Sequence, residues 1–132
     1  MQLHTVGLLL IKDKKLLLAF SNNKQAYYLP GGKIDKGEST QTALIREIEE
    51  ELNIVLRPDK LKYYTHITAL AFGEDNLIME QECFMYEDDV NPKPSGEIRD
   101  VKWFTLLEYL QEKNIAPGAA KVMELLERDE YM

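Results

Sequence analysis

The sequence has one cysteine, no long hydrophobic run and fewer basic than acidic side chains. A single cysteine, Cys83, excludes an internal disulfide and is compatible with a reducing cytoplasm, where we expect the protein to reside. The longest apolar runs, such as residues 6–11, are far shorter than the ~20 residues of a membrane-spanning helix. The first residues lack the basic segment and apolar stretch of a secretory signal. We therefore expect no membrane partner.

The excess of acidic residues limits the possible ligands. The chain has 16 Lys and Arg against 23 Asp and Glu, which gives a formal net charge of −7. Such a charge disfavours binding along the backbone of a nucleic acid polymer. It does not exclude a small phosphorylated ligand, because a bound metal ion would reverse the local field. We therefore expect a small-molecule partner and no nucleic acid polymer.

Length and composition predict a single α/β domain over residues 1–132. Apolar residues make up 45% of the chain and charged residues 30%, which is ordinary for a globular protein able to bury a core. Apolar runs at 3–10 and 15–20, joined by a polar turn, predict a hairpin. The remaining pattern predicts strands at 61–72, 77–86 and 98–104 and short helices at 106–112 and 119–128.

One longer helix is predicted from Ser39 or Thr40 to Leu52. Ser and Thr are favoured N-cap residues, and the apolar residues that follow recur at helical spacing. Asn53 follows at a position where helices often end in a left-handed conformation. The apolar side of this helix is expected to pack against one face of a mixed sheet.

The other side of this helix is crowded with glutamate. Four of the five residues from Glu47 to Glu51 are glutamates, and like charges three or four residues apart on a helix repel. At about 100° per residue, Glu47, Glu50 and Glu51 converge on one side, whereas Glu49 points away. Carboxylate oxygens are the ligands that Mg²⁺ and Mn²⁺ prefer. The glutamates alone also fit an ordinary solvated helix face.

The spacing of the whole segment decides between these interpretations. The segment resembles the Nudix box, in which a glycine, a glutamate, an Arg-Glu pair, a Glu-Glu pair and apolar residues stand at fixed separations. Asn53 replaces the final glycine of the pattern, and Asn tolerates the left-handed conformation. The entry at residues 29–32 and the Trp-containing strand at 100–104 also resemble the family. The matching residues of the box, which covers 32–54, are Gly32, Glu38, Arg46, Glu47, Ile48, Glu50, Glu51 and Ile54.

The resemblance implies a fold, a reaction and a cofactor. The family fold is an α/β/α sandwich with a mixed β-sheet, and its enzymes hydrolyse a diphosphate linked to another moiety, usually with Mg²⁺. By this likeness the catalytic metal ligands are Glu47, Glu50 and Glu51, one of which could also activate water. The carbonyl of Gly32 is a further candidate ligand. Mn²⁺ is a possible substitute for Mg²⁺.

Three further residues acquire expected roles from the resemblance. Glu38 is expected to support the metal ligands without contacting the metal itself, or to contact a second metal. Arg46 is expected to orient the glutamates through charge-assisted hydrogen bonds. Several family members use an additional glutamate in the loop before the Trp strand, and Glu97 lies in that region. An exposed loop acid without a catalytic role is an equally open interpretation of Glu97.

The substrate is less well specified. The downstream proline and tyrosine that mark ADP-ribose and dinucleoside-polyphosphate hydrolases are missing, since Ala69 and Leu70 stand there. The position at which mutator-type enzymes use an asparagine to read an oxidised purine falls near Ala119, with Asn114 a few residues before. By elimination, we expect a mutator-like hydrolase of nucleoside triphosphates or related nucleoside diphosphate derivatives.

Two alternatives stay open at this point. One is an ADP-ribose or nucleotide-sugar pyrophosphatase, and the other is a catalytically silent nucleotide-binding sensor. Tyr27 or Tyr28 could line a base pocket, although sheet packing is the commoner use of such residues, and the substrate-binding residues are otherwise unknown. A homodimer is possible by family likeness, but no surface pattern identifies an interface.

Overall fold

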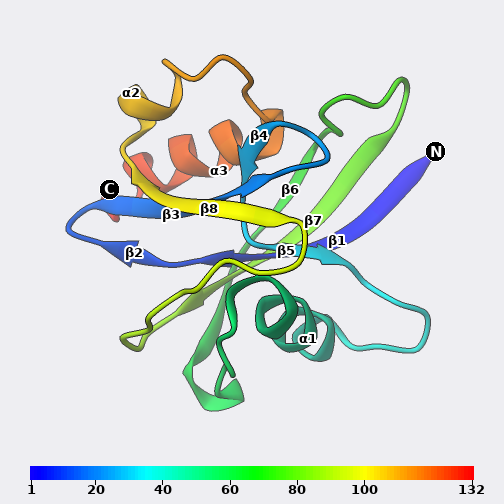
Figure 1. Cartoon of the computed structure of the whole chain (residues 1–132), viewed down its shortest axis with the longest axis vertical. Helices are drawn as coiled ribbons and strands as arrows, with labels where there is room; N and C mark the ends of the chain where they lie inside the picture. Colours follow the sequence, from blue (N-terminus) through cyan, green and yellow to red (C-terminus); the bar gives the residue numbers. More distant parts are fainter.

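A four-stranded mixed sheet forms the centre of the computed structural model, which describes all residues from 1 to 132 (Figure 1). Its strands, in spatial order, are β5 (Gly31–Lys33), β1 (Gln2–Leu9), β7 (Ile78–Tyr86) and β6 (Leu61–Leu70). β1 runs parallel to β7, whereas β5 and β6 are antiparallel to their neighbours. The predicted mixed sheet is therefore confirmed.

A second, antiparallel sheet lies beside the first. β3 (Lys15–Ser21) is its central strand and pairs with β8 (Ile98–Phe104) along nearly its whole length. The other partners of β3 are β4 (Ala26–Tyr28) and the short β2 (Ile11–Lys12). β4 ends two residues before Pro30 and β5 contains both glycines that follow it, so this glycine-rich entry contains strand structure that the sequence pattern alone does not predict.

The predicted hairpin between residues 3–10 and 15–20 is confirmed only next to its turn, where the short β2 pairs with the start of β3. β1 itself does not pair with β3, because it hydrogen-bonds to β7 and β5 in the other sheet. Residues 5–9 are buried almost completely, as is typical of a strand covered on both faces. A distant parallel partner therefore determines the position of β1, and this information is absent from the local sequence.

The glutamate-rich helix is present as predicted. α1 (Thr40–Leu52) begins after Ser39, whose hydroxyl oxygen accepts a hydrogen bond from the Thr42 amide. It ends at Asn53, which has the left-handed φ of 57°. Its four fully buried side chains pack into one core cluster with β1 and the end of β7; they are Ala43, Leu44, Ile48 and Leu52.

The C-terminal helices differ in their bounds from the prediction. α2 (Leu106–Tyr109) is shorter than predicted, because the amides of Gln111 and Glu112 bond to carbonyls three residues earlier and the helix tightens into turns. α3 (Pro117–Arg128) starts two residues earlier than predicted, since Pro is well suited to the first helical position. A 3₁₀ turn at Pro58–Lys60 precedes β6.

α1 and α3 lie on opposite sides of the strands, which gives three layers (Figure 1). One core cluster contains the buried side of α1, and the other contains α3 together with the opposite face of β7. The predicted α/β/α architecture with a mixed sheet is confirmed. No helix of the structure is long and apolar enough to cross a membrane.

Candidate metal centre and the cavity beside it

Two glycines allow α1 to approach β5 closely. A Cβ atom on Gly32 would lie 2.5 Å from Glu47 Oε2, so any larger residue would displace that carboxylate. Gly31 has a φ of +144°, and a Cβ atom there would collide with the carbonyl of Val6. The Gly31 amide donates a hydrogen bond of 3.1 Å to Glu51 Oε1. The glycine entry therefore places two glutamates of α1 directly against the backbone of β5.

Glu51 occupies the most unusual electrostatic position in this region. Burial and, to a smaller extent, the negative charges of Glu47, Glu97 and Glu50 together raise the pKa of its carboxyl to about 8, and the Gly31 amide opposes this rise only in part. Burial also raises the pKa of Glu47, and the hydrogen bond from Arg46 only partly opposes this effect. Negative charge is therefore concentrated on this side of α1 without a matching number of cations.

Arg46 organises the acidic residues around it. Its guanidinium donates to both oxygens of Glu38, at 2.8 and 2.9 Å, and to Glu47 Oε1 at 2.8 Å. It also donates to the Lys33 carbonyl at 3.1 Å. The Arg46 hydrogen bonds lower the pKa of Glu38 to about 2. Arg46 thus fixes the rotamer of Glu47, while both oxygens of Glu38 are engaged by Arg46 and by the Asp35 amide.

The remaining glutamates of the helix differ in position. Glu50 is 61% exposed, and its Oε1 lies 3.6 Å from Arg46 Nη1. Glu49 is exposed and forms no ion pair. In this arrangement no three carboxylate, thiolate or imidazole side chains lie close enough together to hold a metal ion. The structure therefore brings Glu47 and Glu51 together at β5, and leaves Glu50 turned towards Arg46.

The donor set nevertheless suits a hard divalent cation. All the candidate side-chain ligands offer carboxylate oxygens, and the crowding of their charges already disfavours the ionised form of Glu51. Rotation of the exposed Glu50 side chain away from Arg46 would complete a set with Glu47 and Glu51. The Gly32 carbonyl stays a predicted ligand.

Glu97 lies directly before β8. Its Oε2 accepts a hydrogen bond of 3.1 Å from Ser21 Oγ, which ties it to the end of β3. Its negative charge contributes to the raised pKa of Glu51, and both residues line the same cavity. The proximity to Glu51 is the geometry that the catalytic interpretation requires, although its chemical role stays a prediction.

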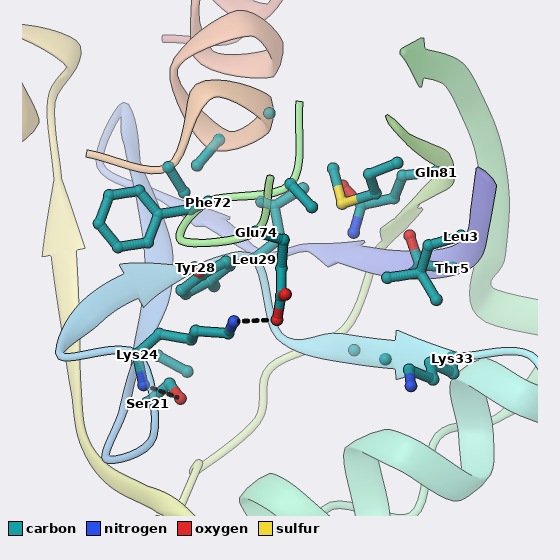
Figure 2. A pocket seen from close by; sticks show the side chains of 18 of the residues that line it. Leu3, Thr5, Ser21, Lys24, Tyr28, Leu29, Lys33, Phe72, Glu74 and Gln81 are labelled. Carbon is teal, nitrogen blue, oxygen red and sulfur yellow. Dashed lines mark hydrogen bonds and ion pairs between the residues drawn. The ribbon is translucent and has the colours of Figure 1, made fainter. Parts of the chain in front are cut away.

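A cavity of 480 Å³ extends from these carboxylates between the two sheets (Figure 2). Its acidic end is lined by Gly31, Gly32, Glu51 and Glu97. Its other end is lined by aromatic and apolar side chains and by the start of α3, with Tyr28, Phe72, Met79 and residues 116–119. The cavity therefore joins a charged region to a largely apolar one.

Two polar side chains are available within the apolar part of the cavity. The Tyr28 hydroxyl is buried without a hydrogen-bond partner, and burial raises its pKa to about 12. Gln81 is only 7% exposed, and its side chain lines the cavity (Figure 2). A buried hydroxyl without a hydrogen-bond partner costs free energy of folding. Its presence beside a cavity therefore points to a ligand or water that supplies the missing hydrogen bond.

Several residues considered from sequence lie elsewhere. Tyr27 donates to Asp100 Oδ2 at 2.6 Å and is absent from the cavity lining, so Tyr28 is the aromatic residue that fits a pocket wall. Asn114 donates to the Gln25 carbonyl and does not line the cavity, whereas Ala119 does. Gln81 and Lys24, which both line the cavity, carry no local sequence signal, because tertiary pairing alone brings them to this region.

Comparisons with known proteins agree with this geometry. The family model described as the NUDIX domain matches residues 1–126. An uncharacterised Nudix hydrolase of Bacillus subtilis, YvcI, is 26% identical over 120 residues, covering 86% of this chain and 72% of the relative. An RNA pyrophosphohydrolase of Ruthia magnifica is 31% identical over 111 residues. That match covers 83% of this chain, and the chain spans 56% of that relative.

Solved structures share the fold. The crystal structure of a MutT NUDIX hydrolase from Burkholderia pseudomallei superposes with a TM-score of 0.78 at 20% identity. The match covers 94% of this chain and 97% of that one. At this level of identity the likeness concerns the arrangement of helices and strands, and not the ligand.

Proposed function

Because this chain belongs to the NUDIX family and is a Nudix hydrolase, we propose that it cleaves a diphosphate bond in a nucleoside triphosphate or a related nucleoside diphosphate derivative. Mg²⁺ is the proposed cofactor, with Mn²⁺ as a possible substitute. The proposed metal ligands are Glu47, Glu50, Glu51 and the Gly32 carbonyl.

One observation supports this substrate class above all: a single cavity joins Glu51 of α1 to an apolar, partly aromatic region. Small-molecule sites are typically concave and mostly apolar, with a few polar groups that set orientation. A base or nucleoside fits the end near Tyr28 and Phe72, and the diphosphate then lies at the acidic end. The volume of 480 Å³ is within the range of about 300–1,000 Å³ typical of ligand pockets.

Different residues of the chain are proposed to bind the metal, to orient its ligands and to accept a proton in such a reaction. A bound Mg²⁺ would neutralise charge on the phosphates and acidify a water molecule. Glu47, Glu50 and Glu51 would hold it, and Arg46 keeps Glu47 in place through the 2.8 Å hydrogen bond. Water adds to one phosphorus atom, the bridging P–O bond breaks, and the water proton passes to a carboxylate of the cavity. Glu51 and Glu97 both line the cavity and are the candidates for that proton.

The proposal is tested with a panel of compounds in Mg²⁺ buffer and identification of every product. The panel contains ordinary and oxidised nucleoside triphosphates, nucleoside diphosphates, ADP-ribose, a nucleotide sugar and an RNA oligonucleotide with a 5′-triphosphate. We expect a nucleoside monophosphate together with pyrophosphate or phosphate from the nucleotide substrates. Preferential cleavage of ADP-ribose or the sugar would contradict the mutator-like assignment in favour of the alternative hydrolase.

The same panel separates an enzyme from a sensor. Tight nucleotide binding without any product, for every compound and both metal ions, would contradict the proposed hydrolysis and favour a binding role. The RNA oligonucleotide is included because the Ruthia relative is an RNA pyrophosphohydrolase. The net charge of −7 leads us to expect that the free nucleotide is cleaved faster than the oligonucleotide.

A further inference from the structure

An ion pair between two loops crosses the lining of the cavity. Lys24 lies in the loop between β3 and β4, and Glu74 lies in the loop between β6 and β7. Lys24 Nζ donates to Glu74 Oε1 at 2.6 Å, although the two residues are 50 positions apart. Both side chains line the cavity, and Figure 2 shows them meeting between Tyr28 on one side and Lys33 on the other.

This ion pair is the one hydrogen-bonded link between the two loops. The loop of Lys24 is otherwise held by Ser21, Asn22 and Asn114, through bonds that do not involve the second loop. The loop of Glu74 is closed internally by backbone bonds at Ala71. The Phe72 ring packs edge-on against Tyr28 at 6.2 Å, so the second loop has an anchor that is independent of Glu74. The ion pair can therefore open without detaching either loop.

The charges that line the cavity favour an exchange of partner at Lys24 when an anionic ligand binds. Only two cations line the cavity, Lys24 and Lys33, against three acids, Glu51, Glu74 and Glu97. A substrate with a diphosphate brings further negative charge, which Glu74 repels and Lys24 attracts. The Lys24 and Glu74 side chains are 34% and 49% exposed, and exposed ion pairs of this kind contribute little to stability. A phosphate oxygen offers Lys24 a charge-assisted hydrogen bond at least as good as the one it gives up.

We propose that the Lys24–Glu74 ion pair is a latch on the cavity, which the phosphate of an entering substrate opens by replacing Glu74 as the partner of Lys24. Lys24 is then a substrate-binding residue that selects for an anionic ligand, and Glu74 is its competitor. The inference rests on the proposed function to the extent that the ligand carries a diphosphate. It adds Lys24 to the proposed substrate-binding residues. This cation comes from a loop, and not from the helix that carries the candidate metal ligands.

The latch predicts opposite effects from neutralising its two members. The probe is α,β-methylene-ADP, which carries the phosphates but resists hydrolysis at that bridge, and its dissociation constant is measured by calorimetry with Mg²⁺. Lys24→Met should raise the dissociation constant about 5- to 20-fold, because one charge-assisted hydrogen bond is lost. Glu74→Gln should lower it about 2- to 5-fold, because the competing carboxylate is gone. Adenosine, which has no phosphate, should bind both variants and the wild type equally.

The Lys15–Glu108 pair provides a matched control. Its distance is 3.5 Å, its side chains are 41% and 45% exposed, and neither residue lines the cavity. Lys15→Met and Glu108→Gln should leave probe binding unchanged. The latch is overturned if Lys24→Met binds the probe as the wild type does, if Glu74→Gln weakens binding as Lys24→Met does, or if the wild type does not bind the probe. A wild type that binds the probe but hydrolyses no compound of the panel overturns the proposed function alone.

Discussion

The two ends of the cavity are constructed in different ways. The acidic end is built mainly from one continuous segment, residues 31–51, in which two glycines and a helix bring Glu47 and Glu51 to the β5 backbone. The apolar end combines side chains from β4, β7, the loop after β6 and the start of α3. Groups suited to the chemical step are therefore local in sequence, whereas those suited to choosing a substrate come together only in the folded chain.

The difference predicts that substitutions at the acidic end act on turnover, and substitutions at the apolar end act on substrate affinity. The largest effect is expected for Glu51→Gln, which removes a charged oxygen donor and should lower kcat on the order of 10²–10³-fold. Steady-state kinetics with the best substrate of the panel measure this loss. Glu49→Gln on the same helix is the matched control and should keep full activity, because Glu49 is exposed and outside the cavity. Equal activity of the two variants would remove the distinction between the helix faces.

Arg46 should have the next largest effect. Arg46→Ala frees Glu47 and Glu38 from their shared partner, and loss of a residue that positions metal ligands costs about 10- to 100-fold in metal affinity or activity. Arg46→Lys should recover only part of the loss, since an ammonium group cannot reproduce the fork to both oxygens of Glu38. The Mg²⁺ dependence of the rate measures the effect. An unchanged Mg²⁺ requirement in Arg46→Ala would contradict the orienting role.

Tyr28 tests the apolar end. Tyr28→Phe removes a buried hydroxyl that has no partner, so the free energy of unfolding should stay the same or rise by about 1 kcal/mol. KM should rise about 2- to 10-fold with kcat unchanged, because Tyr28 lines the cavity and a bound substrate can become the partner that its buried hydroxyl lacks. Urea unfolding and steady-state kinetics are the two measurements. A destabilised variant with an unchanged KM would show that the hydroxyl serves the fold and not the ligand.

The acidic end and its helix were the most predictable parts of the molecule. The cap at Ser39, the end at Asn53 and the buried stripe of α1 all follow from local rules, and the structure confirms them. The convergence of three glutamates was only partly predictable, since helical geometry places Glu50 near Glu47 but also one turn after Arg46. The rotamers decide between these two partners, and in the structure Glu50 lies 3.6 Å from Arg46.

The apolar end could not be predicted in the same way. The hairpin prediction failed for β1, because β1 pairs with β7, whose partner residues lie 76 positions away, as in Val6 opposite Glu82. Lys24 meets Glu74, and Gln81 enters the cavity, only through such long-range pairing. Tyr28 was one of two candidates from sequence, and the hydrogen bond of Tyr27 to Asp100 separates them.

The raised pKa of Glu51 has a consequence for stability. Burial raises this pKa from 4.5 to about 8 in the folded chain, so between these pH values the folded state binds a proton that the unfolded state has released. The stability of the metal-free protein should therefore fall as the pH rises from about 5 to 8, by at most about 1.4 kcal/mol per pH unit from this group. A cation at the site favours the ionised carboxylate and should reverse the trend.

The most direct test of the metal centre is the thermal midpoint of the protein at pH 5 and pH 8, with EDTA and with Mg²⁺. For the wild type we expect the midpoint in EDTA to fall with rising pH, and Mg²⁺ to raise it more at pH 8 than at pH 5. In Glu51→Gln both the decline and the Mg²⁺ effect should shrink, whereas Glu49→Gln should behave as the wild type does. A Mg²⁺ effect that is absent at pH 8, or that is the same in Glu51→Gln, would contradict a cation site on these glutamates.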